Sequence, residues 1–168
     1  MEINKRELID PNERKFPNEV CFQPIGIVHS PFSELKGIPI QSSMSDAKGK
    51  IEIFQQYQKA LKDLAGFSHI ICIYFFDMVK SPVLLQSKPF LIDEIKGVFA
   101  IRTPFRPNPI GFSILHLNRI DENILFVEDL DILDKTPVLD IKPYIPQFDS
   151  RKTSKIGWLK GNIKRKVS

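Results

Sequence analysis

The sequence predicts a mainly β fold: a small β-barrel domain with one or two short helices and no Rossmann sheet. Short runs of β-branched and aromatic residues recur along the chain and are separated by turns rich in Pro, Asn and Asp. Only one segment has apolar residues at convincing helical spacing. No GxGxxG motif follows a predicted strand, which argues against a Rossmann cofactor fold.

The first half of the chain is predicted to contain three strands and the helix. Strands are expected at 20–28, at 50–54, and at 68–76, where a nearly continuous apolar run indicates a central strand. The helix is expected at 55–64, with Gly66 just beyond its end. Its apolar face consists of Tyr57, Ala60, Leu61 and Leu64.

The second half of the chain is predicted to contain only strands, turns and loops. An irregular loop with two prolines is expected over 81–95. Turns are expected at 121–123 and at 134–137. The strands follow from short apolar, β-branched runs between these turns. They are expected at 98–101, 112–120, 124–127, 130–133 and 138–141.

Length and composition fit one globular domain. A chain of 168 residues can bury a real core. We expect a polar arm at 1–19, the barrel domain at 20–149 and a basic tail at 150–168. No apolar run approaches a membrane span or a signal core, so neither is expected. Cys21 and Cys72 lie in apolar runs and are interpreted as buried thiols of a cytoplasmic protein. The three histidines form no close pair, and no metal site is expected.

The positive charge of the chain is concentrated at its C-terminal end. Of the 24 basic residues, seven lie between 150 and 168, where there is no acidic residue. The 17 others are outnumbered by the 20 acidic residues. Such a tail suits a polyanion such as RNA. The alternative is a solvated chain end. The seven are Arg151, Lys152, Lys155, Lys160, Lys164, Arg165 and Lys166.

The stretch 97–113, GVFAIRTPFRPNPIGFS, carries two arginines on a chain stiffened by proline. Each proline fixes its own φ and restricts the preceding residue, and Gly111 permits backbone paths that are closed to other residues. The stiff chain is therefore expected to hold the guanidinium groups of Arg102 and Arg106 in fixed positions, as hydrogen-bond donors to carboxylates, phosphates or nucleobases. The alternative is a rigid turn whose arginines cap carbonyls or face solvent. The prolines are Pro104, Pro107 and Pro109.

Carboxylates follow or interrupt two apolar segments. Asp77 stands where the run 68–76 ends, and the segment LDILDKTPVLD carries several more. Structural ion pairs with the arginines, together with turn capping at Asp134, are one interpretation. A polar pocket in the mouth of the barrel is the other. The polar residues of the second segment are Asp131, Asp134, Thr136 and Asp140.

These segments together resemble the TsaA-like family, also called TrmO. The matching motifs are PIGIVHSPF (24–32), GIPIQ (37–41), GFSHIICIYFF (66–76), VFAIRTPFRPNPIGFS (98–113) and LDILDKTPVLDIKPYIP (130–146). The resemblance implies a small barrel that dimerises and binds S-adenosylmethionine without a Rossmann sheet. It also implies methylation of threonylcarbamoyladenosine in the anticodon loop of tRNA, with tRNA as the partner.

The resemblance also implies which residues contact the cofactor. These are Ser42, Ser43, Met44, Asp77, Met78, Arg102, Ile114, Asp134, Lys135, Thr136 and Pro137. The chain departs from the family pattern at three positions: an arginine is usual at Ile40, a histidine at Asp77 and a glycine at Lys135. Lys135 makes a left-handed turn costlier than glycine would.

Methyl transfer requires alignment of donor and acceptor, and here also removal of a proton from an amide-like nitrogen. Asp134 and Asp140 are the candidate bases. Arg106, with Arg102, is expected to bind the carboxylates of methionine or of the threonyl group. Tyr144 or Phe105 are candidates for stacking on a base, although core packing is the favoured interpretation of each aromatic. A non-enzymatic RNA-binding barrel, or a methyltransferase for another nucleoside or a small molecule, remain alternatives.

Overall fold

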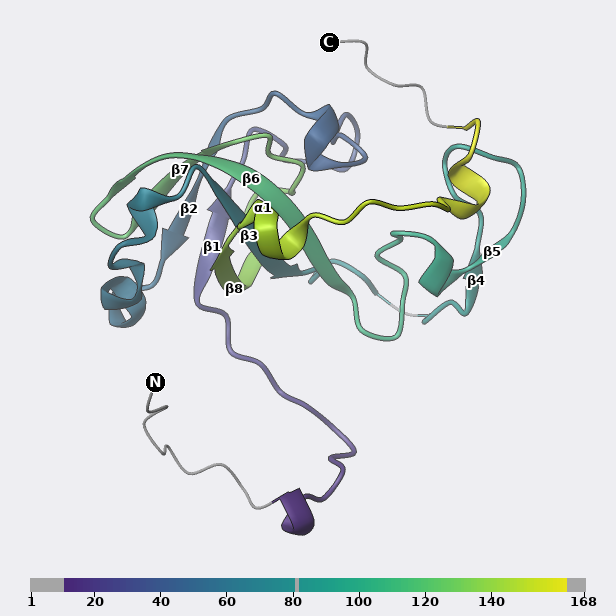
Figure 1. The fold of residues 1–168 in the computed structure, drawn as a ribbon, viewed down its shortest axis with the longest axis horizontal. Coiled ribbons are helices and arrows are strands. Elements are labelled where there is room, and N and C mark those ends of the chain that lie inside the picture. The colour runs from purple at the N-terminus through teal and green to yellow at the C-terminus, as the bar shows by residue number, and fades with distance from the viewer. Residues whose placement is uncertain (1–10, 81, 163–168) are drawn as a thin grey trace.

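The protein is a closed six-stranded antiparallel barrel, which confirms the predicted fold class (Figure 1). The computed structural model describes residues 11–80 and 82–162. Around the barrel the strand order is β1-β2-β7-β6-β3-β8. The strands are β1 (Gly26–His29), β2 (Gly49–Ile53), β3 (His69–Phe75), β6 (Ile110–Asp121), β7 (Ile124–Glu128) and β8 (Pro137–Pro143).

Alternating side chains from all six strands fill the barrel. In β3 the residues Ile70, Cys72 and Tyr74 are buried, while the residues between them are partly exposed. The strand lies between β6 and β8, as its apolar sequence predicted. Gly111 of β6 pairs with Tyr74, and a Cβ there would lie 2.1 Å from the tyrosine ring. Only glycine therefore allows this ring to pack against β6.

The predicted helix at 55–64 is wrong in type and extent. The chain forms two 3₁₀ segments, η3 (Gln55–Leu61) and η4 (Leu64–Gly66), separated by Asp63 in the left-handed region at φ 66°. Tyr57 packs against the core from this segment, as do Leu61 and Leu64. A ten-residue helix has little stability of its own, so packing at the barrel end decides the backbone path. A four-residue helix, α1 (Pro146–Asp149), was not predicted.

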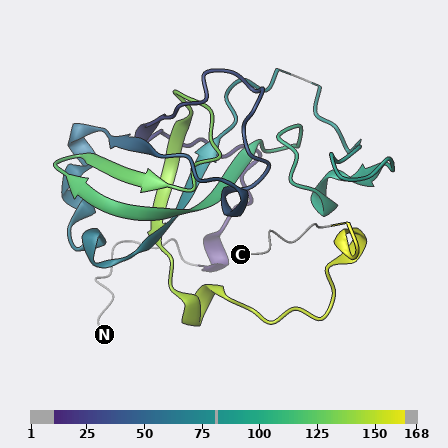
Figure 2. The same ribbon diagram turned by 90° about the horizontal axis from the view of Figure 1, so that it is seen from above.

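The segment between β3 and β6 leaves the barrel and forms a separate two-stranded sheet of β4 (Gln86–Ser87) and β5 (Lys96–Gly97) (Figures 1 and 2). The strand predicted at 98–101 is wrong, because it is a 3₁₀ turn, η5 (Val98–Ala100). One turn buries Val98 and Ile101 together and leaves Phe99 81% exposed. A strand would instead turn alternate residues toward the core.

Three further expectations need correction. The first strand begins at Gly26, after Pro24, rather than at residue 20. The segment 130–133 contains no strand, although Leu130 and Ile132 are buried. Cys21 is exposed on the arm that precedes the barrel, and only Cys72 is a buried thiol.

The described part of the chain contains no helix that is both long and apolar enough to cross a bilayer. Within the same residues, no three His, Cys, Asp or Glu side chains cluster closely enough to hold a metal ion.

Candidate functional site

Three loops meet at the end of the barrel where β3 ends and β6 and β8 begin. They are the arginine–proline loop (102–109), the aspartate turn (129–136) and η2 (Ser42–Met44). The Phe76 N–H donates to the Pro109 carbonyl at 2.8 Å, which ties the end of β3 to the arginine–proline loop. The buried Ser45 hydroxyl donates to the Leu130 carbonyl at 2.6 Å, which ties η2 to the aspartate turn.

A row of polar side chains runs from the barrel interior to the aspartate turn. The Ser113 hydroxyl donates to Asp131 Oδ1 at 2.6 Å and lies 3.2 Å from the Tyr74 hydroxyl. Both Tyr74 and Ser113 are almost fully buried. Burial raises the pKa of the Asp131 carboxyl, while hydrogen bonds from Ser113 and from the Ser42 N–H, together with the charge of Arg102, oppose the rise. Asp131 therefore joins the core, η2 and the arginine–proline loop.

Arg102 is exposed and faces the same region. Its guanidinium donates to the side-chain oxygen of Gln41, the residue before η2. Within the described residues it forms no ion pair, and its charge acts on Asp131 only over a longer distance. Most of its five donors are therefore available to a ligand.

The Arg106 side chain, in contrast, contacts residues close to it in the sequence. The side chain is half-buried, and Nη1 donates to the Ile101 carbonyl at 3.4 Å. The guanidinium carbon lies 5.9 Å from the centre of the Phe99 ring, within the range of a cation–π contact. The structure thus shows that Arg106 caps a carbonyl of its own loop, whereas Arg102 is exposed and bonded to Gln41, an arrangement that fits either a ligand-binding donor or a solvent-facing arginine.

The aspartate turn is held against the end of β1. Asp134 Oδ1 accepts the Ser30 N–H at 2.9 Å, and the Asp134 N–H donates to the Phe32 carbonyl at 2.8 Å. Lys135 has φ 66°, the left-handed conformation that was expected to favour glycine. Thr136 is buried at 4% exposure. The Asp134 carboxylate therefore binds the chain after β1, at a position 104 residues away, rather than capping its own turn as one interpretation of the sequence expected.

The structure brings most of the predicted cofactor contacts to this end of the barrel. Asp77 and Met78 are exposed just after β3. They directly follow Phe76, whose N–H bonds the Pro109 carbonyl of the arginine–proline loop. Ile114 neighbours Ser113 in β6 but pairs with Ile71, and its side chain lies on the outer face. The remaining contacts lie on the loops already described, except for Pro137, which is the first residue of β8. Those on the loops are Ser42, Ser43, Met44, Arg102, Asp134, Lys135 and Thr136.

Asp140 lies apart from this group. It stands three residues into β8, about 10 Å along an extended strand from Pro137. Its carboxylate pairs with Lys142 at 2.6 Å and borders a hollow of about 390 Å³ beneath η3 and η4. The two candidate bases, Asp134 and Asp140, therefore do not share one site.

Sequence reasoning did not identify Gln41, Tyr74 or Ser113 as parts of the site. Tyr74 and Ser113 lie within apolar runs, and their inward positions follow only once the alternation of β3 and β6 is fixed. The signal that could have identified Tyr74 and Ser113 is a hydroxyl at an inward-facing position of a barrel strand. No such signal marks Gln41 in the sequence, since its partner Arg102 is 61 residues away.

The polar groups at this end suit a small ligand that carries both charges. An exposed guanidinium fits a carboxylate, whereas the half-buried carboxylates of Asp131 and Asp134 fit cationic groups. S-adenosylmethionine has one carboxylate, one ammonium and one sulfonium, so these residues fit it.

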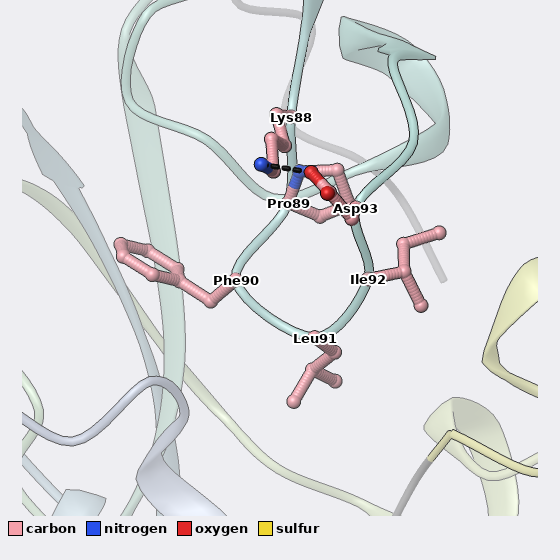
Figure 3. A pocket seen from close by; sticks show the side chains of 6 residues that line it. All are labelled: Lys88, Pro89, Phe90, Leu91, Ile92 and Asp93. Carbon is pink, nitrogen blue, oxygen red and sulfur yellow. Dashed lines mark ion pairs between the residues drawn. The ribbon is translucent and has the colours of Figure 1, made fainter.

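The hollow at loop 88–93 belongs to a different part of the molecule. It measures about 520 Å³ and is lined by that loop alone. An ion pair of Lys88 with Asp93 closes the loop, and the side chains of Phe90, Leu91 and Ile92 point outward from it (Figure 3). Its two charged lining residues, Lys88 and Asp93, are paired with each other, so we do not assign the site here.

Comparisons with known proteins agree on one relationship. Residues 27–150 match the family model of the tRNA-methyltransferase O N-terminal domain. A probable S-adenosyl-L-methionine-binding protein of Pyrococcus abyssi is 51% identical over 148 residues, which cover 88% of this chain and 80% of that protein. The tRNA (adenine(37)-N6)-methyltransferase of Escherichia coli is 36% identical, over 77% of this chain and 59% of its own length.

A solved structure has the same fold. The crystal structure of TrmO from Pseudomonas aeruginosa superposes with a TM-score of 0.70 at 32% identity, covering 83% of this chain and 62% of that one. The chain thus spans about 60% of the length of the Escherichia coli and Pseudomonas proteins.

Proposed function

The chain belongs to the tRNA-methyltransferase O family of S-adenosylmethionine-dependent enzymes, and from this premise we propose that it methylates N6 of adenine 37 in tRNA. The family predicted from the sequence motifs is confirmed by the match over residues 27–150. We propose further that the acceptor is threonylcarbamoyladenosine, as the resemblance of the motifs implies.

One observation carries the proposal. Arg102 and the carboxylates of the aspartate turn lie at one end of the barrel, yet no ion pair joins them within the described residues. Ion-pair partners would neutralise each other and leave little for a ligand. Groups of opposite charge that remain apart suit a ligand with complementary charges.

Bound S-adenosylmethionine would supply an activated methyl group, which leaves its sulfur as a new bond forms to the acceptor nitrogen. The task of the protein is to align donor and acceptor and to exclude water. We assign the carboxylate of the methionine part to Arg102. Ser42, Ser43 and Met44 form η2, whose Ser42 N–H bonds Asp131, and we assign the rest of that ligand to this turn.

The proton on the acceptor nitrogen needs a base, and we assign this role to Asp134. Its carboxylate lies in the aspartate turn, where the Ser30 N–H holds one oxygen at 2.9 Å. That bond fixes the direction of the other oxygen. Asp140 is the second candidate, but its pairing with Lys142 at 2.6 Å on another part of β8 favours a structural role.

Arg106 and the aromatics complete the proposed acceptor side. The guanidinium of Arg106 is half-buried in the arginine–proline loop and suits the carboxylate of a threonyl group. Phe105 is 42% exposed on the same loop and can stack on a base. Tyr144 instead lies beside His69, with ring centroids 6.3 Å apart, and we assign it to packing.

We also propose that the protein acts as a homodimer in the cytoplasm. The closed barrel leaves few strand edges to cover, so edge pairing between two copies is not the expected contact. Exposed apolar side chains near the site support dimerisation instead. Among these are Phe75, Phe105, Ile110 and Phe112, each between 38% and 50% exposed. A monomer mass by light scattering at micromolar concentration would contradict the dimer.

The function is tested in two steps with the full chain. Calorimetry with S-adenosylmethionine asks whether the cofactor binds at all, and no heat at millimolar cofactor would exclude a methyltransferase. Mass spectrometry of nucleosides then asks which tRNA nucleoside gains a methyl group on incubation with protein and cofactor. A non-enzymatic RNA-binding barrel would bind tRNA with strong salt dependence but ignore the cofactor.

A further inference from the structure

The C-terminal segment runs from α1 to the sheet of β4 and β5 and ends there in η6 (Gly157–Leu159) (Figures 1 and 2). Trp158 Nε1–H donates to the Ala100 carbonyl at 2.8 Å, a contact between residues 58 positions apart. The Trp158 carbonyl in turn accepts Asn162 Nδ2–H at 2.7 Å. Trp158, which is half-buried, therefore anchors the segment on η5.

The anchor lies close to the candidate site. Ala100 is two residues before Arg102, and Lys160 is two residues after Trp158. Two steps of 3.8 Å place the Cα atoms of Arg102 and Lys160 within about 7.6 Å of those of the bonded residues. Part of the predicted basic tail is therefore anchored on η5, two residues before the arginine–proline loop begins.

The cations of this segment have no anionic partner in the described part of the chain. Arg151, Lys152, Lys155 and Lys160 are all exposed, and none of the ion pairs among the described residues includes them. No acidic residue occurs between 150 and 168. The first 149 residues carry more acidic than basic groups, so a polyanion is attracted to this side of the molecule rather than to the whole surface.

We propose that Trp158 holds the basic C-terminal segment beside the arginine–proline loop as an arm that binds the phosphate backbone of the tRNA whose base enters the site. The inference rests on the proposed function and adds the surface that the RNA occupies. The contact is electrostatic and carries no sequence information, because lysines on an exposed segment reach phosphates rather than base edges. Lys164, Arg165 and Lys166 lie outside the described residues.

A charge-matched pair of double variants tests the position of the arm. K155Q/K160Q removes two cations from the arm, and the control K59Q/K62Q removes two exposed lysines from η3 and its end. Binding of unfractionated tRNA and of an anticodon stem–loop RNA is measured by fluorescence anisotropy over a series of KCl concentrations. We expect the slope of log affinity against log salt to fall by about two for K155Q/K160Q, and affinity near 0.1 M salt to fall about 10- to 100-fold. The control should change neither quantity by more than about threefold.

Replacing Trp158 tests the anchor itself. W158F keeps an aromatic ring but loses the donor to Ala100, so we expect weaker tRNA binding and a higher KM for tRNA. Cofactor affinity by calorimetry and kcat at saturating tRNA should be unchanged. Circular dichroism verifies that the fold is intact.

The results separate the two proposals. If the unaltered chain binds both ligands and the arm variants bind tRNA equally well, the arm is refuted and the methyltransferase stands. An equal loss in both lysine pairs also refutes the arm, because it indicates general charge attraction. If the unaltered chain binds cofactor but no RNA, the proposed acceptor and the arm both fail.

Discussion

Replacing Arg102 by alanine tests whether this side chain faces a ligand or supports the fold. In the free protein the exposed guanidinium donates to the exposed side of Gln41 and to no carboxylate among the described residues. An exposed contact of this kind contributes about 1 kcal/mol or less. For a chain of this length, that corresponds to a fall in Tm of about 2–4 °C.

The loss should appear in cofactor binding instead. A hydrogen bond to a charged group contributes about 1.5–3 kcal/mol, so affinity for S-adenosylmethionine should fall about 10- to 140-fold. Calorimetry gives the affinity, and thermal unfolding without cofactor gives the stability. R102K should lose part of the affinity, since it retains the charge but not the planar fork. R119A is the matched control, because it also removes an exposed arginine. The Arg119 guanidinium lies 3.3 Å from the centre of the Phe126 ring on β7 and is not part of the candidate site, so cofactor affinity should not change.

The opposite pattern would refute this reasoning. If Arg102 compensates the charge of Asp131 in the free protein, R102A leaves a half-buried carboxylate without that compensation. The cost would then be about 3–5 kcal/mol, with a fall in Tm of at least about 6 °C. A large fall in Tm with unchanged cofactor affinity would identify Arg102 as a structural partner.

Three further substitutions test the geometry around the site. G111A should cost about 1–3 kcal/mol of unfolding free energy in urea titrations, because the new Cβ would lie 2.1 Å from the Tyr74 ring, and an unchanged midpoint would contradict that packing. K135G should raise stability by up to about 1 kcal/mol, since glycine adopts φ 66° freely, and a lower Tm would show that the lysine side chain stabilises the turn. The raised pKa of Asp131 means that the folded state gains stability from the protonated carboxyl below its ordinary pKa of 3.8 and loses it as pH rises through the raised value. D131N lacks this titration, so denaturation across pH should show the variant becoming more stable relative to the parent as pH rises toward neutrality, and a constant difference would contradict the shift.

Much of the barrel was predictable because strand signals in this chain are local. The runs that became β3 and β6 are long, rich in β-branched residues and bounded by turns, so their type and approximate limits follow from sequence alone. The helical segments were not predictable in the same way. Residues 55–64 have helical spacing, but packing at the barrel end and the left-handed Asp63 divide them into two 3₁₀ segments.

The site was predictable in its residue types but not in its contacts. Arg102 and Asp134 were identified because polar residues that directly follow apolar runs often lie at the open end of a barrel. The bond of Arg102 to Gln41 and the bond of the Ser42 N–H to Asp131 join positions that only the closed barrel brings together. The predicted turn at 134–137 and strand at 138–141 separate Asp134 from Asp140 along the chain, but the pairing of Asp140 with Lys142 became visible only in the folded structure.

The fixed positions of Asp131 and Arg102 explain why these two side chains do not form an ion pair in the free protein. Asp131 accepts from Ser113 at 2.6 Å and from the Ser42 N–H, so its carboxylate is fixed to the barrel wall and η2. Arg102 belongs to a loop whose prolines restrict the backbone, and it donates to Gln41, the residue before η2. Each group is thus prevented from moving onto the other, and neither is neutralised. The barrel end therefore carries two groups of opposite charge that are not paired with each other, and a ligand with both charges can bind them without displacing an ion pair.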